Sequence, residues 1–146
     1  MMCAMELNVV KVAAETAYRL EEQRKDELAK VEFIKAQEAT ITLCETTIND
    51  ALVERAKSRS SLVYEERYVE SIDRLGNTLF HPLTKDAHGY ANGTPSYSVN
   101  RKVAYSKEAL EEYLSSFCLS VEWETASYCH WGCGACYCKR LIVKAE

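Results

Sequence analysis

Apolar side chains recur every three or four residues through the first third of the chain, with polar and charged residues between them. The stripe comprises Ala13, Ala17, Leu20, Leu28, Val31 and Ile34, and it resumes with Ile41, Cys44, Ile48, Leu52 and Ala56. Such spacing is typical of one face of an amphipathic helix. Residues 1–75 contain neither glycine nor proline, the two strongest helix breakers. The pattern therefore predicts helix from about residue 6 to residue 57.

Two arrangements fit this helical region. One is a single helix of about 50 residues, far above the average length of roughly 11–12. The other is a helical hairpin or a sharp bend near Thr40–Thr47, where β-branched residues weaken the helix. We favour the hairpin or bend. The stripe is expected to pack either on the C-terminal sheet or on a second copy of itself.

Beyond residue 57 the apolar period changes to the alternation of a β-strand. Within 58–70 the alternating positions are Leu62, Tyr64, Glu66 and Tyr68. Enrichment in aromatic and β-branched residues supports a first strand there. Residues 76–95 have the composition of a long loop, including an Asn-Gly turn signal. A short strand is expected at 97–105, followed by a helix over 107–117 with Ser106 as its N-cap.

The C-terminal segment predicts a β-hairpin. Residues 118–128 and 137–145 are both rich in strand-forming residues, and we expect them to pair antiparallel across a cysteine-rich turn. The predicted fold is α+β in a single domain of residues 1–146. A long N-terminal helix or helical hairpin occupies 1–57. The α+β part, 58–146, contains a small antiparallel sheet, one further helix, the long loop 76–95 and the C-terminal β-hairpin.

Composition and charge narrow the classes of function. The 146 residues are 47% apolar with a net charge of −4, so the chain can bury a core of its own. The negative charge makes nucleic acid an unlikely direct ligand, because phosphate binding needs basic surface. No apolar run reaches the length that spans a membrane. Residues 1–75 are acidic, with 11 Lys and Arg against 15 Asp and Glu, and seven cysteines without an export signal indicate a reducing cytoplasm.

Four cysteines and a histidine lie in the expected hairpin turn and at the start of the strand that follows it. Cys129, Cys133, Cys136 and Cys138 read C-x3-C-x2-C-x-C, and four thiolates satisfy the tetrahedral coordination of zinc. Standard zinc ribbons have two C-x2-C knuckles and this turn has one, so free thiols, or a disulfide from Cys129, are the alternatives. We predict one structural zinc ion bound by the four cysteines, with His130 replacing Cys138 as a ligand if that thiol points elsewhere.

No catalytic motif is visible in the sequence, whether a Gly-rich phosphate loop, H-E-x-x-H or G-x-S-x-G. His81 and His88 are expected to be exposed polar residues rather than ligands. The loop and hairpin are rich in tyrosine and tryptophan, which protein interfaces favour for their large contact area. The candidate partner-binding residues are Trp131, Tyr90, Tyr128, Tyr137 and His88.

The segment 107-KEALEEYLSSFCLSVEWETASYCHWGCGACYCKRLIVKAE-146, in which a short helix leads to a strand and a Trp-containing hairpin, resembles small accessory proteins of bacteriophages. The resemblance implies a small, non-catalytic protein that binds a host macromolecule. An anti-CRISPR protein or another anti-defence inhibitor is an example of that class.

The leading hypothesis is a cytoplasmic, non-catalytic protein that occupies a surface of a host protein partner. A homodimer through the helical half is a further option within it. The alternative is a zinc-stabilised nucleic-acid-binding module that uses Lys139, Arg140, Arg101 and Lys102. The third hypothesis is a Cys-dependent enzyme, in which Cys118 or Cys133 is paired with His81 or His88.

Overall fold

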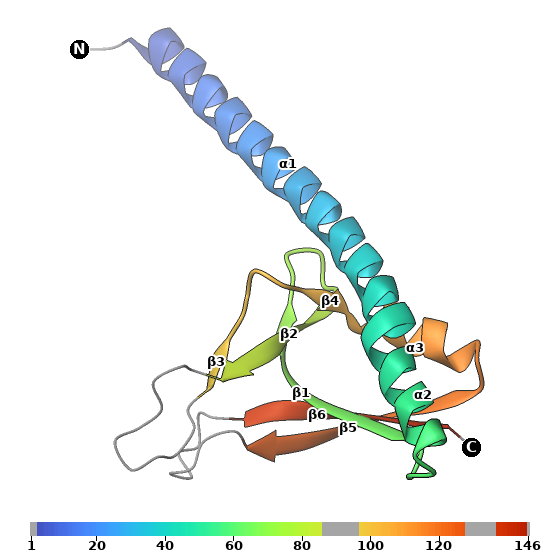
Figure 1. Ribbon diagram of the computed structural model, residues 1–146. Helices are drawn as coiled ribbons and strands as arrows, with labels where there is room; N and C mark the ends of the chain where they lie inside the picture. The colour runs from blue at the N-terminus through green and yellow to red at the C-terminus, as the bar shows by residue number, and fades with distance from the viewer. Residues whose placement is uncertain (1–2, 86–96, 128–136, 146) are drawn as a thin grey trace, which may run out of the picture.

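The computed structural model describes residues 3–85, 97–127 and 137–145, and it shows a long helix standing on a smaller body of sheet and helix (Figure 1). Along the chain the elements are α1 (Ala4–Leu43), the π-helical turn η1 (Cys44–Ile48), α2 (Asn49–Lys57), β1 (Val63–Ile72), β2 (Thr78–Lys85), β3 (Tyr97–Val99), β4 (Tyr105–Ser106), α3 (Lys107–Ser115), β5 (Leu119–Ser127) and β6 (Tyr137–Ala145). This order confirms the predicted α+β fold.

Within the described residues, the strands form one six-stranded sheet in the order β3-β2-β1-β6-β5, and β4 pairs with β2. Every pairing is antiparallel. β5 and β6 pair along their whole length, from Leu119 opposite Ala145 to Ser127 opposite Tyr137. This register confirms the predicted pairing of the two C-terminal strands. The cysteine-rich turn between them lies outside the described residues.

α1, η1 and α2 form one uninterrupted helical rod, so the hairpin favoured at Thr40–Thr47 is wrong and the single-helix alternative is confirmed (Figure 1). Three of the four threonines in this stretch, Thr40, Thr42 and Thr46, donate a side-chain hydrogen bond to the carbonyl four residues earlier. Thr40 reaches Ala36 at 2.6 Å and Thr46 reaches Thr42 at 2.7 Å. Because these hydroxyls are satisfied inside the helix, they do not compete with it by forming a turn.

The π-helical turn keeps the apolar stripe directed at the body. Thr40, Cys44 and Ile48 are buried and follow one another at four-residue steps. In an α-helix each such step overshoots a full turn by about 40°, so a stripe with this spacing would rotate away from the body. The wider π turn offsets the excess. As a result Ile48, rather than the exposed Thr47, reaches the core.

The core lies between the sheet and the helices that cover it. Its most completely buried large apolar side chains are Ile48, Tyr68, Phe80, Leu110, Leu141 and Val143. The rings of Tyr68 and Phe80 meet edge to face with their centroids 4.8 Å apart, a favourable aromatic geometry. Leu110 and Leu114 are the buried residues of α3. The strands and α3 therefore share one core with the C-terminal part of the helical rod.

Strand β2 occupies residues 78–85, where the sequence predicts a loop over 76–95, so that part of the loop prediction is wrong. Phe80 of β2 pairs with Glu70 of β1 and is fully buried. Pro82 hides this strand in the sequence, because proline has no N–H group to donate and normally lies at sheet edges. Here the carbonyl of Pro82 accepts a hydrogen bond from the Asn100 N–H at 3.0 Å. Residues 86–95 lie outside the described residues.

His81, predicted to be exposed, is instead buried, with only 6% of its surface accessible. Its Nε2 lies 2.7 Å from the Ser71 hydroxyl, and its Nδ1 lies 3.0 Å from the Val103 carbonyl oxygen. A buried imidazole needs a partner at each nitrogen, and the neighbouring strand and the segment before β4 supply both. His81 therefore serves as a structural link within the sheet.

The strand expected over 97–105 is present only at its ends, as β3 and β4, with a turn between them. The helix expected after it is confirmed. The Ser106 hydroxyl accepts a hydrogen bond from the Ala109 N–H at 3.3 Å, as an N-cap does. α3 thus begins at the residue that the sequence indicates.

Candidate protein-interaction surface

The body covers only the C-terminal part of α1, and only along one side. Ala36, Thr40 and Leu43 are the buried residues of this helix. The Thr40 hydroxyl also accepts a hydrogen bond from the Ser106 N–H at 2.7 Å, which ties the rod to the start of α3. Before Ala36, no residue described in α1 is buried, and Figure 1 shows this part of the helix projecting beyond the body.

The turn between β1 and β2 supports the projecting part of α1 from the same side. Arg74 in this turn forms ion pairs with Glu22 and with Asp26, the latter at 2.6 Å from Nε to Oδ1. Hydrogen bonds from Arg74 to Asp26 and Glu22 raise the pKa of its guanidinium, so the group stays charged. The ion pairs fix which side of the helix is turned toward the body.

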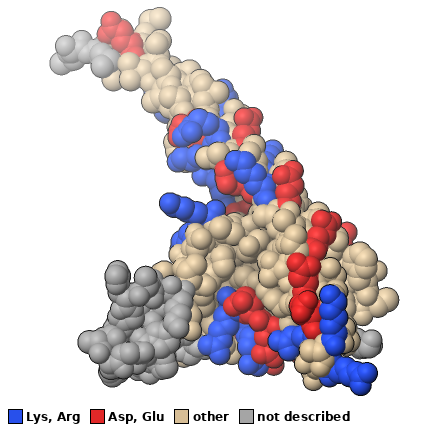
Figure 2. Space-filling view, viewed as in Figure 1, with Lys and Arg blue, Asp and Glu red and all other residues tan. Residues whose placement is uncertain are grey.

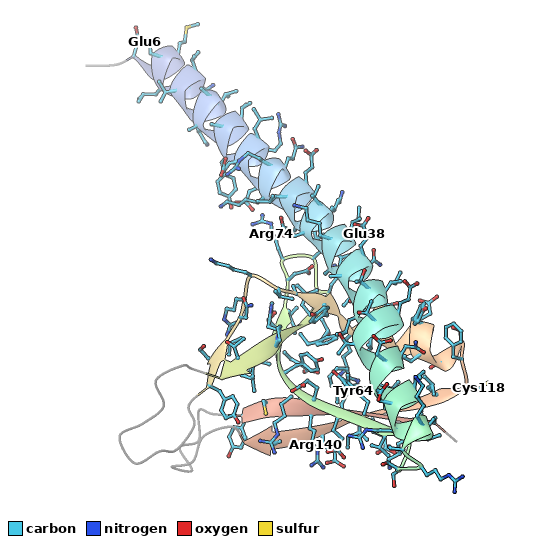
Figure 3. All side chains as sticks on the ribbon, viewed as in Figure 1. Glu6, Glu38, Tyr64, Arg74, Cys118 and Arg140 are labelled. Atoms are coloured by element: carbon cyan, nitrogen blue, oxygen red, sulfur yellow. The ribbon has the colours of Figure 1, made fainter. Side chains whose placement is uncertain are left out.

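The opposite side of α1 carries a row of mainly apolar residues that we call the outer face. Its members follow one another in alternating steps of three and four residues, as the a and d positions of a coiled coil do. They are Val10, Ala13, Ala17, Leu20, Arg24, Glu27, Val31, Ile34, Glu38 and Ile41. The large apolar members are between 40% (Ile41) and 57% (Leu20) exposed. Figure 3 shows Glu38 on the edge of α1 opposite Arg74.

The first turns of α1 are apolar beyond the outer face as well. Further exposed side chains there are Met5, Leu7, Val9, Val12 and Tyr18. In Figure 2 these turns accordingly present mostly uncharged surface. A helix that is apolar on several sides is normally covered by other structure. No helix in the described ranges is long and apolar enough to cross a membrane.

The projecting part of α1 is poorly suited to stand alone in water. Its β-branched residues Val9, Val10, Val12 and Thr16 have lower helix propensity than alanine or leucine. Most helical stability in proteins comes from packing an apolar face rather than from propensity. We therefore expect contacts along the outer face to stabilise this half of the helix.

An apolar groove of about 500 Å³ lies beside the C-terminal end of the helical rod. Ile48 and Leu52 line it from the rod, and Leu62, Phe117 and Leu119 line it from the segments that flank the sheet and α3. The Tyr113 hydroxyl donates a hydrogen bond of 3.4 Å to Glu45, which also lines the groove. The groove therefore extends the apolar surface of the rod at its C-terminal end.

Cys44 of the helical rod and His81 of the sheet are both held in unreactive settings. Burial raises the pKa of the Cys44 thiol to about 11, so the nucleophilic thiolate is scarce near neutral pH. Both ring nitrogens of His81 already have partners. Neither residue supplies an activated nucleophile or a free general base. Cys118 lies where the sequence placed it, exposed at the junction between α3 and β5.

Of the four predicted zinc ligands, only Cys138 is among the described residues. It is buried in β6 opposite Ala126, and burial raises the pKa of its thiol. Cys129, Cys133 and Cys136 lie outside the described residues, as does His130. Among the residues that the structure does describe, no three His, Cys, Asp or Glu side chains are grouped to bind a metal. The zinc site stays a prediction.

The predicted partner-binding aromatic residues are described only in part. Tyr137 begins β6 and is 61% exposed, as an interface residue needs to be. Trp131, Tyr90, Tyr128 and His88 lie outside the described residues, so their roles stay predictions.

The basic residues of the nucleic-acid hypothesis lie on two separated parts of the sheet. Lys139 and Arg140 belong to β6, whereas Arg101 and Lys102 follow β3, with β1 and β2 between the two sites. Arg140 forms an ion pair with Glu124 on the neighbouring strand. Figure 2 shows Lys and Arg intermixed with Asp and Glu over the visible face. A single-sign surface of the kind that attracts phosphates is not formed by these four residues.

Sequence reasoning found the apolar stripe but not the direction in which each part of it faces. Its second part, with Cys44 and Ile48, packs on the body, whereas Leu20, Leu28 and Val31 are about half exposed. One signal for this difference is present in the sequence. Arg24 and Glu27 occupy the row between Leu20 and Val31, and charged residues are rarely buried in a dry core without partners.

Comparisons with protein-family models, with curated proteins and with solved structures each find no match. The function of this chain is therefore inferred from its geometry alone. The resemblance to bacteriophage accessory proteins stays a prediction.

Proposed function

We propose that the chain is a non-catalytic binding protein that engages a protein partner along the outer face of α1. The observation that carries the proposal is the row from Val10 to Ile41, which is exposed along its length, while the body holds the opposite side of the helix from Glu22 onward. In this view the body, formed by the sheet and α3, is a support. It fixes the helix through Thr40 and Arg74, so that the outer face of α1 is presented to a partner.

The chemistry of the outer face favours a protein over other ligands. Burial of a large aliphatic side chain contributes about 1.5–3 kcal/mol, and the row offers five: Val10, Leu20, Val31, Ile34 and Ile41. A ridge with three- and four-residue spacing fits the groove of another helix. An inhibitor of a host defence nuclease is the role that the bacteriophage resemblance implies.

A photo-crosslinking experiment in cells that naturally express the chain tests this proposal. A photoreactive phenylalanine analogue at position 31 lies on the outer face, and the same analogue at position 19 lies on another side of the helix. We expect covalent protein adducts from position 31 and few from position 19. The adducts should be lost when Leu20→Asp is added. Equal labelling from both positions, or no protein adduct at all, would contradict the proposal.

A further inference from the structure

We infer that the occupant of the outer face is a second copy of this chain, bound antiparallel about a twofold axis that passes between residues 25 and 26. The inference rests on the proposed function, because it names the partner of the same face. It follows from where the two charges of the central part of the row lie and from which residues they would meet in each possible pairing.

The charged residues Arg24 and Glu27 interrupt the apolar row near its middle and have opposite signs. In an antiparallel pair centred between residues 25 and 26, Arg24 of each copy lies level with Glu27 of the other. The interface then holds two symmetry-related pairs of opposite charge. Charge complementarity of this kind sets the orientation and register of helix pairs.

The same register aligns the apolar members with one another. Leu20 lies level with Val31 of the second copy, Ala17 with Ile34 of the second copy, and Val10 with Ile41 of the second copy. Each pair joins an a position to a d position, as antiparallel coiled coils require. A small residue faces a large one in two kinds of layer, Ala17 with Ile34 and Ala13 with Glu38, which helps the helices to interdigitate.

Apart from the two central charged layers, the layer of Ala13 and Glu38 is the least apolar of the row. The methyl group of Ala13 leaves space beside the Glu38 side chain of the second copy, which can turn its carboxylate toward water. No like charges face each other between Val10 and Ile41 in this register. The continuous interface spans the 32 residues from Val10 to Ile41, a length of about 47 Å.

A parallel pairing of the same row is disfavoured by the same charges. In a parallel pair in register, Arg24 faces Arg24 of the second copy, and Glu27 and Glu38 likewise face their own counterparts. Three layers of like charge would then lie within one interface, and such contacts are destabilising. The row of this chain is therefore complementary to itself in one direction only.

The position of the body leaves room for the antiparallel pair. The body is attached to the inner side of α1 through Ala36 and Thr40, toward the C-terminal end of the helix. In the antiparallel pair the two bodies lie at opposite ends of the helix pair and on opposite sides of it. The projecting half of one helix then packs on the C-terminal half of the second helix, which is the half that the body of the second copy supports. This isologous arrangement closes on itself as a dimer.

Arg24 is already held in the single chain in a way that suits this role. Its Nη2 and Nε donate hydrogen bonds to Glu21 at 2.7 and 3.1 Å. A guanidinium has five N–H donors, so Arg24 can keep Glu21 and still bind Glu27 of the second copy. The bond to Glu21 fixes the direction of the Arg24 side chain before association.

Charge reversal in the purified full-length chain tests the inference. The variants are Arg24→Glu and Glu27→Arg, and sedimentation equilibrium measures their association. Each single variant places like charges in both central contacts of the antiparallel pair. We expect each to self-associate about tenfold more weakly than the parent chain or worse, because two attractive contacts become repulsive. An equimolar mixture of the two variants should restore association, since every central contact then joins opposite charges.

The matched controls are Arg19→Glu and Glu15→Arg, the same reversals on other sides of the helix, and they should associate like the parent chain. Thermal unfolding of each variant shows whether its body is still folded. If the purified parent chain is monomeric, the inference is wrong. If the two central variants self-associate like the parent, the antiparallel pairing is wrong, because a parallel pair has like charges facing in every one of these chains.

The crosslinking experiment separates failure of this inference from failure of the proposed function. A monomeric purified chain whose position 31 still labels a different protein in cells would retain the function and overturn the dimer. A monomeric chain with no protein adduct from position 31 would overturn both. An adduct between two copies of the chain, together with restored association in the mixture, would support both.

Discussion

The two ends of α1 carry the same apolar period but meet different surroundings. Near its C-terminal end, Ala36, Thr40 and Leu43 are buried against the body. Toward its N-terminal end, Leu20 and Val31 are about half exposed. An apolar period thus indicates a face that other structure should bury, but it does not identify which structure buries it. On the inner side near the C-terminal end, the sheet and α3 of the same chain cover the helix, and on the outer face we propose that a second copy does.

The polar residues of the two ends differ in a matching way. In the buried end, the Thr40 hydroxyl donates to the Ala36 carbonyl and accepts from the Ser106 N–H, so it is fully satisfied inside the chain. The exposed end instead places Arg24 and Glu27 in the row. Burial of such charges is costly unless opposite charges meet them. The core that the chain completes itself thus uses a hydroxyl, whereas the face that we propose a second copy covers carries charges of opposite sign.

The largest expected effect comes from placing a charge at a buried position of the helical rod, compared with an exposed one. Ile48 is 1% exposed, so Ile48→Asp buries an unpaired carboxylate and should lower the free energy of unfolding by about 4 kcal/mol. Leu28 is 52% exposed, and Leu28→Asp should change it by less than about 1 kcal/mol. Urea unfolding followed by far-UV circular dichroism measures both. Equal losses for the two variants would show that Leu28 is as deeply buried as Ile48.

Thiol reactivity compares the two ends without a mutation. Cys3 at the start of α1 is exposed, whereas Cys44 is buried and its pKa is raised from 9.0 to about 11. At pH 8 this shift alone lowers the thiolate population of Cys44 about a hundredfold, so iodoacetamide should modify Cys3 at least that much faster. Mass spectrometry of timed digests reads the two sites separately. Comparable rates would mean that the helix opens around Cys44.

The same shift predicts a pH dependence of stability. The pKa of Cys44 is higher in the folded chain than in the unfolded one, so the folded state retains the thiol proton to higher pH. The associated stability is fully present below about pH 9 and should be lost as the pH rises toward about 11. Cys44→Ala should remove this component of the alkaline destabilisation. A parent chain and variant with identical pH profiles in this window would contradict the assignment.

Local patterns predicted most elements of this fold, and their failures have identifiable physical causes. The helical rod, β1, the Ser106 cap with α3, and the β5–β6 pair all follow from period and capping residues. β2 was missed because Pro82 lies in its middle and no local pattern indicates a strand there. The burial of Phe80 in the core stabilises β2 instead. The hairpin near Thr40–Thr47 was wrong because threonine hydroxyls bond back within a helix.

The candidate site was only partly predictable, since exposure depends on tertiary contacts. The stripe was visible in sequence, but the choice between a sheet and a second copy requires knowing where the body ends. His81 shows the same limit from the other direction. Its partners Ser71 and Val103 come from distant positions, and no local pattern indicates that both would converge on one imidazole.

A moderate effect is expected where the rod is tied to α3. Thr40 is fully buried, and Thr40→Val keeps the shape of the side chain but leaves the Ser106 N–H without its acceptor. An unsatisfied buried donor costs about 1–3 kcal/mol, and we expect a loss of unfolding free energy in that range. Thr42→Val is the matched control, because Thr42 is exposed and bonds only to Glu38 within the helix. A loss as large for Thr42→Val would indicate a helix-propensity effect instead.

The smallest expected effect concerns the support of the projecting half by the β1–β2 turn. Arg74 holds Glu22 and Asp26 through exposed ion pairs, which contribute little and are screened by salt. Arg74→Ala should leave global unfolding nearly unchanged but speed amide hydrogen exchange around Glu22 and Asp26 at low salt. The difference should fade as salt is added. Arg74→Lys keeps the charge but loses the planar guanidinium, so its amide exchange rate should lie between those of the parent chain and Arg74→Ala. Exchange that is equally slow in Arg74→Ala at low salt would mean that the second copy, or the helix itself, holds this segment without the turn.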